Sequence, residues 1–157
     1  MLFRSLWGSL VGRLLHFYWR FARGMTFGVR GLVVDAAGRV LLVQHSYVRG
    51  WHLPGGGVEP GETMLEALTR ELAEEGNIRL TGAPRMHGIF FNRRASRRDH
   101  VAVYIVDDFS QDGPFTPSRE ITHACFFALD SLPNDTTAGT RARIAEVLGG
   151  APISEHW

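Results

Sequence analysis

The feature that most constrains this fold is a loop rich in glycine and proline that leads directly into one uninterrupted helical segment. Gly and Pro crowd residues 46–61 and exclude a regular helix or strand there. Residues 62–75 contain neither, and Leu65, Leu68 and Leu72 recur at spacings of three and four, which predicts an amphipathic helix. The leucine face of this helix must pack on the rest of the chain.

Strand-like segments surround the predicted helix. The runs 26–35 and 40–45 are rich in Val and Leu and flank a short turn, which predicts a β-hairpin. Further strands are expected over 85–91, 100–107 and 122–129, and a closing helix over 137–148. This order of elements predicts an α/β (α+β) protein in which a mixed sheet lies between helices.

Length and composition indicate one globular domain. The chain has 157 residues, of which 45% are hydrophobic and 21% charged, and this usage excludes disordered and fibrous classes. The net charge of +1 argues against general nucleic-acid binding, and no DNA partner is expected. Cys125 cannot form an internal disulfide, and its Phe- and Ala-rich neighbourhood predicts a buried thiol. A reducing, cytoplasmic location is therefore expected.

Residues 1–24 differ from the remaining domain, residues 25–157, because no acidic residue precedes Asp35. Apolar side chains recur there at spacings of four and three, which predicts an amphipathic helix; they are Phe3, Trp7, Leu10, Leu14, Phe17 and Phe21. Arg13 and Arg20 interrupt the apolar run, so this helix is not expected to span a bilayer. Packing on the domain, a homodimer and contact with the inner membrane surface stay open as ways of covering the stripe.

The predicted helix over 62–75 carries carboxylates in a pattern that favours a bound cation. Glu71, Glu74 and Glu75 lie three and four positions apart, so they share one side of the helix and repel each other. Glu75 also lies seven residues beyond Leu68, at the edge of the leucine face, where an uncompensated carboxylate is costly. A metal removes both penalties, and ligands that are all oxygen favour Mg²⁺ or Mn²⁺.

The spacing Gly-x5-Glu-x7-Arg-Glu-Leu-x-Glu-Glu from Gly56 to Glu75 resembles the signature box of the Nudix hydrolases, which runs on to Ile78. Weaker family patterns are found at 51–56, 120–121 and 126–133. Asn77 occupies the position where the family usually has Gly. Because Asn is the next-best residue for a left-handed helix end, this departure is expected to cost little stability.

The resemblance implies a Nudix-like fold and hydrolysis of a nucleoside diphosphate linked to another group. The carboxylate pattern makes Glu71 and Glu75 the first candidates for metal ligands, with Glu74 as a ligand or the general base. The resemblance adds the Gly55 carbonyl as a ligand and gives Arg70 the task of orienting Glu71 or Glu74. A simple salt bridge within the helix is the alternative for Arg70.

Residues outside the box supply further candidates. Several family members use a position like that of Glu120, just before a strand, for a base or a metal ligand. The candidates for substrate binding are Arg30, Trp51, Arg93 and Arg94. The last two belong to an arginine-rich turn that could bind phosphates or RNA, or could be a solvated hairpin tip. The histidines, including His45 and His52, lack metal-ligand spacing and are predicted to be structural.

The expected substrate is a nucleotide-type small molecule, and the sequence does not distinguish among nucleoside triphosphates, ADP-ribose, dinucleoside polyphosphates, sugar nucleotides and an RNA cap. The alternative is a Nudix-fold sensor that binds a nucleotide without cleaving it. The intact set Glu71, Glu74 and Glu75 favours catalysis, because a binding module has no reason to keep repelling carboxylates together.

Overall fold

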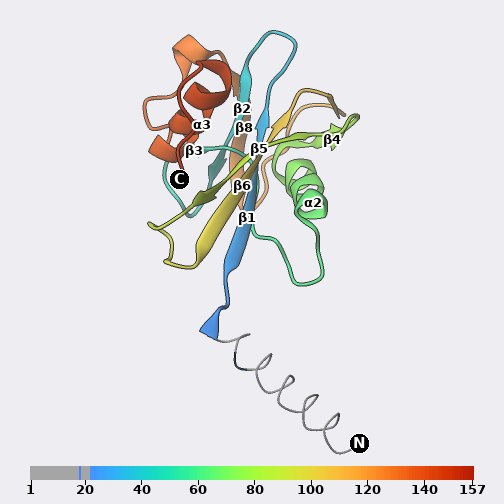
Figure 1. Cartoon of the computed structure of the whole chain (residues 1–157). Helices are drawn as coiled ribbons and strands as arrows, with labels where there is room; N and C mark the ends of the chain where they lie inside the picture. Colours follow the sequence, from blue (N-terminus) through green and yellow to red (C-terminus); the bar gives the residue numbers. More distant parts are fainter. Residues whose placement is uncertain (1–17, 19–21) are drawn as a thin grey trace, which may run out of the picture.

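Two three-stranded sheets lie side by side at the centre of the molecule, as seen in Figure 1. The structure, a computed structural model, describes Tyr18 and residues 22–157, so the amphipathic helix expected over residues 1–24 falls almost entirely outside the described residues. The first sheet has the order β1-β6-β5 and consists of β1 (Thr26–Val33), β6 (Asp99–Val106) and β5 (Arg85–Phe91). The second has the order β3-β2-β8 and consists of β3 (Trp51–His52), β2 (Val40–His45) and β8 (Ile121–Phe127).

The first sheet is mixed, as predicted, because β1 runs parallel to β6 and β5 runs antiparallel to it. Two short strands form a separate antiparallel pair; they are β4 (Ile78–Leu80) and β7 (Phe109–Gln111). These strands, β3 and the short 3-10 helix η1 (Leu129–Ser131) are too brief to leave a periodic pattern, and the sequence did not predict them.

The predicted hairpin between β1 and β2 is wrong. The turn is present, since the Asp35 carboxylate accepts bonds from the backbone N–H groups of Ala37 and Arg39. However, the two strands share only the bridge between Val34 and Val40, and each then pairs within a different sheet. Their continuous Val and Leu runs are buried on both faces, which is typical of strands covered on two sides rather than of a hairpin with one exposed face.

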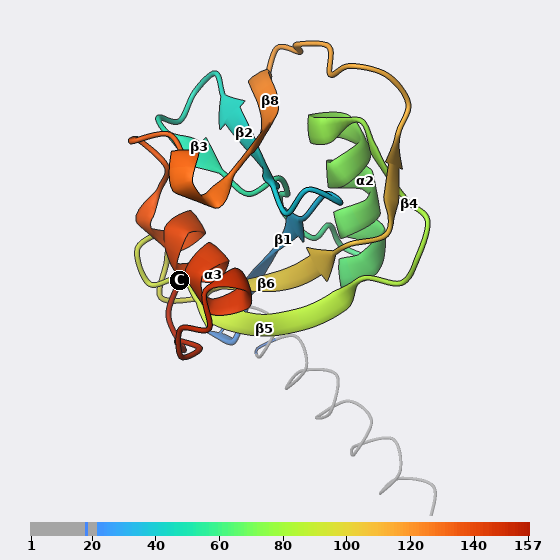
Figure 2. The ribbon, with the colours of Figure 1, turned by 90° about the horizontal axis from the view of Figure 1, so that it is seen from above.

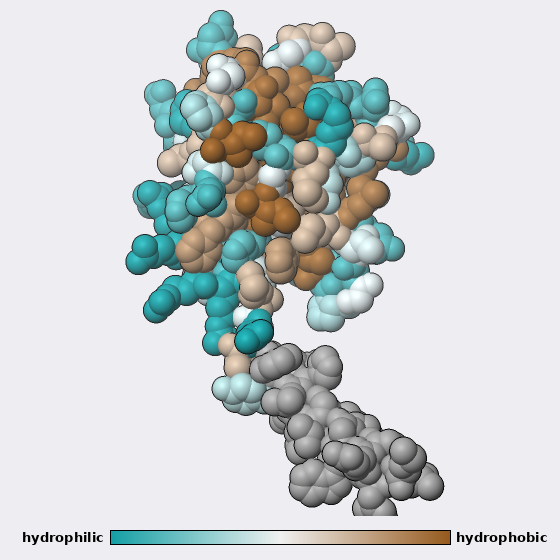
Figure 3. All heavy atoms as spheres, viewed as in Figure 1, coloured by the Kyte–Doolittle hydropathy of each residue, from teal (hydrophilic) through white to brown (hydrophobic). Residues whose placement is uncertain are grey.

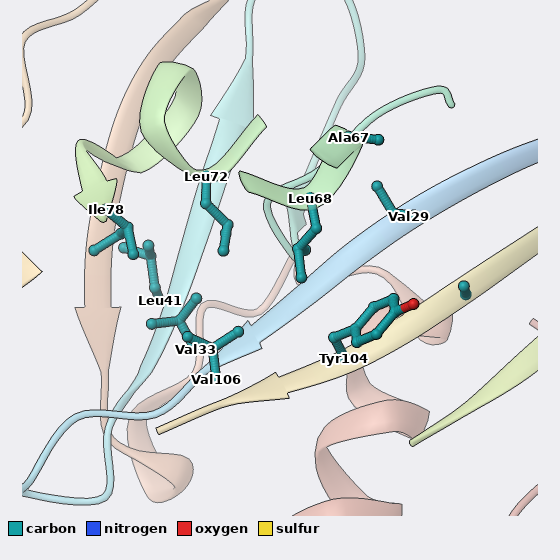
Figure 4. Packing of buried hydrophobic residues seen from close by; sticks show 10 residues of the cluster. Val29, Val33, Leu41, Ala67, Leu68, Leu72, Ile78, Tyr104 and Val106 are labelled. Carbon is teal, nitrogen blue, oxygen red and sulfur yellow. The ribbon is translucent and has the colours of Figure 1, made fainter. Parts of the chain in front are cut away.

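Helices cover opposite sides of the strands, and Figure 2 shows α2 and α3 separated by them. α2 (Met64–Gly76) packs on β1, and the predicted leucine face is confirmed for Leu68 and Leu72, which are fully buried. It is wrong for Leu65, which lies in the first turn of the helix and is 46% exposed. In Figure 4 these two leucines point toward side chains of β1 and β6, among them Val33 and Tyr104. α3 (Ala138–Leu148) lies against the second core cluster.

Local signals fix both ends of α2. The Thr63 side chain accepts a bond from the Glu66 backbone N–H, and the Glu66 side chain accepts one from Thr63, which is a capping box. At the other end Asn77 adopts the expected left-handed conformation, with φ 53° and ψ 37°. Its side chain also donates to the carbonyl groups of Asp112 and Gly113, at 3.0 and 3.3 Å, a contact that glycine could not make.

The prediction of a buried Cys125 thiol is wrong, because this residue is exposed. Side chains alternate along β8: Ala124 and Phe126 pack against the first core cluster, whereas His123 and Cys125 face outward. Ala124 and Phe126, the apolar residues on either side of Cys125, therefore belong to the opposite face of the strand.

A buried ion network joins α3 to β5 and to the last residues of the chain. Arg143 Nη2 lies 2.5 Å from Glu146 Oε1, and Glu146 Oε2 lies 3.0 Å from His87 Nε2. The Arg143 guanidinium also stacks over the Phe90 ring, 3.7 Å from its centroid. Burial acts to raise the pKa of Glu146, but hydrogen bonds from His87, Ser154 and Arg143 outweigh it and leave that pKa below its ordinary value.

The surface carries apolar side chains among polar ones. Figure 3 shows hydrophobic residues gathered in the upper and central parts of one face, with hydrophilic residues around its margin. Tyr47 and Ile153 are the most exposed large hydrophobic residues of 22–157, at 70% and 62%. Within the described part of the chain, every helix is too short or too polar to cross a bilayer.

Candidate active site

A cleft of about 560 Å³ opens between the first residues of β1, the glycine-rich loop before α2 and the turn that follows β2. The predicted site residues that line it are Arg30, Gly55, Glu71, Glu75 and Glu120. Two of these carboxylates come from α2, and Glu120 comes from the segment before β8. The Ser46 backbone N–H donates to the Glu120 carbonyl at 2.8 Å and so ties that segment to the turn after β2.

Glu75 lines the cleft and is only 7% exposed, so it is buried more deeply than its expected position at the edge of the leucine face indicated. Its Oε2 accepts a bond of 2.6 Å from the Gly55 backbone N–H, and its Oε1 lies 3.8 Å from His45 Nδ1. Burial raises the pKa of Glu75 to about 7; the Gly55 N–H and Arg30 oppose this rise, while two neighbouring carboxylates add to it. A negative charge at this position is therefore incompletely compensated.

The glycine-rich loop lies directly against β1 and α2. The backbone N–H of Val29 donates to the Gly56 carbonyl at 2.8 Å, which holds the loop along the free edge of β1. Gly55 has φ 139°, and a Cβ there would lie 2.1 Å from the Val29 carbonyl oxygen. A Cβ on Gly56 would lie 2.3 Å from Glu71 Oε1. Only glycine allows the loop to come this close to both the strand and the carboxylate.

Arg70 holds Glu71 in place. Its Nη1 lies 2.6 Å from Glu71 Oε1 and 3.8 Å from Glu74 Oε2, so its contact with Glu71 is the closer one. Its Nε donates to Glu62 Oε1 at 3.0 Å and its Nη2 to Glu62 Oε2 at 3.1 Å. Nη2 also donates to the Gly57 carbonyl. Arg70 therefore does more than pair along the helix, because it ties α2 to the loop in front of it.

Arg30 faces the same loop from β1. Its Nη1 donates to the carbonyl oxygens of Leu53, at 3.2 Å, and of Gly55. Burial lowers the pKa of Arg30, and the charges of Glu75 and Glu71 oppose that effect. The carbonyl that the family resemblance names as a metal ligand thus already accepts a hydrogen bond from a guanidinium.

The donors at this cleft suit a hard divalent cation, although they do not form a closed set of ligands. Carboxylates and a backbone carbonyl are the ligands that Mg²⁺ and Mn²⁺ prefer. Among the residues that the structure describes, however, no group of three His, Cys, Asp or Glu side chains is arranged to hold a metal ion. Glu74 is 63% exposed and lies outside the main cleft, in an adjoining hollow of about 420 Å³ that Glu71, Glu75 and Glu120 also line.

The structure does not bring the other predicted substrate contacts into the cleft. Trp51 packs edge-on against Phe127, with ring centroids 4.9 Å apart, at the margin of the second core cluster. Arg93 and Arg94 are exposed in the turn between β5 and β6. Their neighbours in that turn, Asn92 and Ala95, do line the cleft.

A group of aromatic residues at the cleft was not expected from the sequence. The His45 ring lies 5.3 Å from the Tyr47 ring and 5.4 Å from the His52 ring, and all three residues line the cleft. Burial, followed by the charges of Arg30 and His52, lowers the pKa of His45 to about 4, so its imidazole is neutral near pH 7. The sequence placed His45 at the end of a predicted strand and Tyr47 and His52 in the irregular loop after it, and no spacing signal there indicated a cluster.

Comparison with known proteins identifies the family. The family model described as "NUDIX domain" matches residues 25–148. Diphosphoinositol polyphosphate phosphohydrolase 2 of Rattus norvegicus is 40% identical over 74 residues, 46% of this chain and 41% of that protein. A putative 8-oxo-dGTP diphosphatase of Bacillus subtilis is 44% identical over 50 residues, 32% of this chain and 34% of that protein. The chain thus spans less than half the length of these two relatives.

Among solved structures, the MutT NUDIX hydrolase of Burkholderia pseudomallei is similar with a TM-score of 0.67 and 27% sequence identity. The likeness covers 78% of this chain and 97% of that one. The loop, the helix and the carboxylates described above all lie within the residues that the family model matches. This chain belongs to the NUDIX domain family, the family of the Nudix hydrolases.

Proposed function

We propose that the protein is a Nudix pyrophosphohydrolase that uses Mg²⁺ or Mn²⁺ to hydrolyse the diphosphate linkage of a nucleoside diphosphate joined to another group. The observation that carries the proposal is Glu75, a carboxylate only 7% exposed at the inner wall of an open cleft. Such a charge is costly without a counter-ion. A divalent cation between Glu75 and Glu71 would compensate it, and a binding module would gain nothing from keeping it.

Some residues of the cleft would bind the cation, and another would take the proton from the attacking water. Glu71, Glu75 and the Gly55 carbonyl would hold the cation, with Arg70 fixing the rotamer of Glu71. The cation, when bound, supplies positive charge that neutralises the diphosphate and the leaving phosphate. Glu120 lines the cleft from the segment before β8 and is our candidate for the general base.

Glu74 is the second candidate for the base or for a further metal ligand, since it faces the adjoining hollow together with Glu120. Arg30 would contact the phosphates of the substrate from inside the cleft. Arg93 and Arg94 would act only on a substrate long enough to leave the cleft past the turn between β5 and β6. Trp51 has a weaker claim, because its ring packs on Phe127.

The substrate class follows from this chemistry and from the relatives. Their names specify an 8-oxo-dGTP and a diphosphoinositol polyphosphate, both of which contain linked phosphates. By likeness to the relative named for 8-oxo-dGTP, we propose a nucleotide-type small molecule, with a capped RNA end as one form of it. We also propose that residues 25–157 form the catalytic domain and that the protein is cytoplasmic. Residues 1–24 would be a separate element that packs on the domain, forms a homodimer or contacts the inner membrane surface.

A nucleotide-library hydrolysis screen with Mg²⁺ and with Mn²⁺, read as phosphate and pyrophosphate release, tests the proposal. Glu75→Gln is expected to lower kcat at least ~100-fold on any substrate found, because a ligand is lost while side-chain volume is kept. Glu59→Gln, a change at an exposed residue of the same box, is the matched control and should keep its activity. Tight nucleotide binding without turnover of any compound would favour the sensor instead.

A further inference from the structure

Two different cations, the Arg30 guanidinium and the expected metal ion, would bind the same oxygen atom of the cleft. The Gly55 carbonyl oxygen is an expected metal ligand, yet it accepts a hydrogen bond from Arg30 Nη1, which also donates to the Leu53 carbonyl. Arg30 is held there by its own strand, because Val29 and Gly31 on either side of it donate backbone bonds of 2.8 and 2.9 Å to the same loop. The contact is therefore built into the pairing of β1 with the loop.

The surrounding charges suit a cation at this point. Glu75 and Glu71, in that order, are the groups whose charges most favour the protonated Arg30 guanidinium against its burial. Arg30 in turn opposes the rise in the pKa of Glu75 that burial causes. The guanidinium thus supplies part of the charge compensation that a divalent ion would give to Glu75.

We propose that Arg30 is an internal substitute for the metal: in the metal-free protein its guanidinium binds the Gly55 carbonyl, and it leaves that oxygen when a divalent cation binds. This inference rests on the proposed function. Two cations a few ångströms apart in a half-buried cleft repel strongly, so Arg30 must weaken metal binding and must move when the metal arrives. Once released, its planar fork of donors is free to pair with a phosphate in the same cleft.

Metal binding to the full chain without substrate tests the proposal. Mn²⁺ is titrated into the wild type and into Arg30→Met, Arg30→Gln and Arg30→Lys, and free Mn²⁺ is followed by its EPR signal. The two neutral variants should bind Mn²⁺ about tenfold more tightly than the wild type, because the competing charge is gone. Arg30→Lys keeps the charge and should stay near the wild-type affinity. The matched control, Arg85→Met, removes an equal charge outside the cleft and should also leave the affinity unchanged.

A second measurement is made on the wild-type protein, so it does not depend on a variant that binds the metal. In ¹H–¹⁵N spectra of the wild type, the Arg30 Nε–H signal, assigned as the one missing from Arg30→Lys, should shift when Mg²⁺ is added, whereas the Arg85 signal should not. A stationary Arg30 signal in a protein that binds Mg²⁺ overturns the proposal. Unchanged or weaker Mn²⁺ binding by both neutral variants does the same, while the metal site itself would stand. If neither the wild type nor the neutral variants bind Mn²⁺, the metal site and this inference are both wrong.

Discussion

Replacing Glu75 by Gln should stabilise the metal-free protein at the same time as it removes activity. In the folded state the pKa of Glu75 is raised from 4.5 to about 7, chiefly by burial. The folded protein therefore binds more protons than the unfolded chain between these two values, so the free energy of unfolding falls as the pH rises through this window. Gln has the same shape and cannot ionise, so the variant escapes this loss.

The size of the effect follows from the shift in pKa. A difference of about 2.5 units corresponds to about 3 kcal/mol when the group is fully ionised, as it is at pH 8. The amide should also fit the site, since its oxygen can accept the Gly55 N–H as Glu75 Oε2 does. Its NH₂ group can approach His45 Nδ1, which is buried with no hydrogen-bond partner in the described structure. We expect Glu75→Gln to raise the free energy of unfolding by about 1–3 kcal/mol at pH 8.

Urea denaturation in the presence of EDTA, followed by tryptophan fluorescence at pH 5 and pH 8, measures this difference. At pH 5 most of the folded wild type carries a protonated Glu75, so the two proteins should agree within about 1 kcal/mol. Glu59→Gln removes an exposed charge and should match the wild type at both values. A Glu75→Gln protein that is no more stable than the wild type at pH 8 would refute the argument that burial leaves this carboxylate under-compensated.

Three further predictions concern other parts of the chain. Gly55→Ala should cost at least ~2 kcal/mol of stability, because a Cβ would meet the Val29 carbonyl at 2.1 Å and the backbone has φ 139°; Gly57→Ala, which has open space, is the thermal-melting control. Glu146→Gln should cost ~3 kcal/mol at pH 7 and less at pH 3, because the lowered pKa of Glu146 gives stability that is fully present above pH 4.5 and declines as the pH falls below it; equal deficits at both values would contradict this. Deleting residues 1–24 should change the oligomeric state or lower the Tm while hydrolysis persists. If the deletion instead abolishes binding to anionic vesicles and leaves the mass and the Tm unchanged, a membrane contact is favoured.

Local patterns predicted the helices well because they depend on near neighbours. The leucine spacing and the absence of Gly and Pro predicted α2 to within two residues at each end. The seven-residue step from Leu68 to Glu75 predicted a carboxylate at the edge of the core, and Glu75 is in fact buried there. The hairpin was predicted wrongly because a continuous apolar run does not reveal which strand it will pair with.

The interior of the site depended on contacts between distant segments. Arg30 meets Gly55 across 25 positions, and the cleft also includes His45. Neither residue carries a spacing signal, because strand pairing and not local sequence brings them to the glycine-rich loop. Arg30 was a candidate for substrate binding, but its contact with the expected metal-ligand carbonyl was visible only in the folded chain.

The pairing of the glycine-rich loop with β1 also bears on aggregation. β1 lies at one edge of its sheet, and an open edge of this kind is a template for pairing with other chains. Here the N–H groups of Val29 and Gly31 are taken by carbonyls of the loop, and the Val58 N–H returns a bond to the Phe27 carbonyl. The loop that carries the expected metal ligand thus also blocks the sheet edge, so a substitution that detaches it would make the protein prone to self-association as well as inactive.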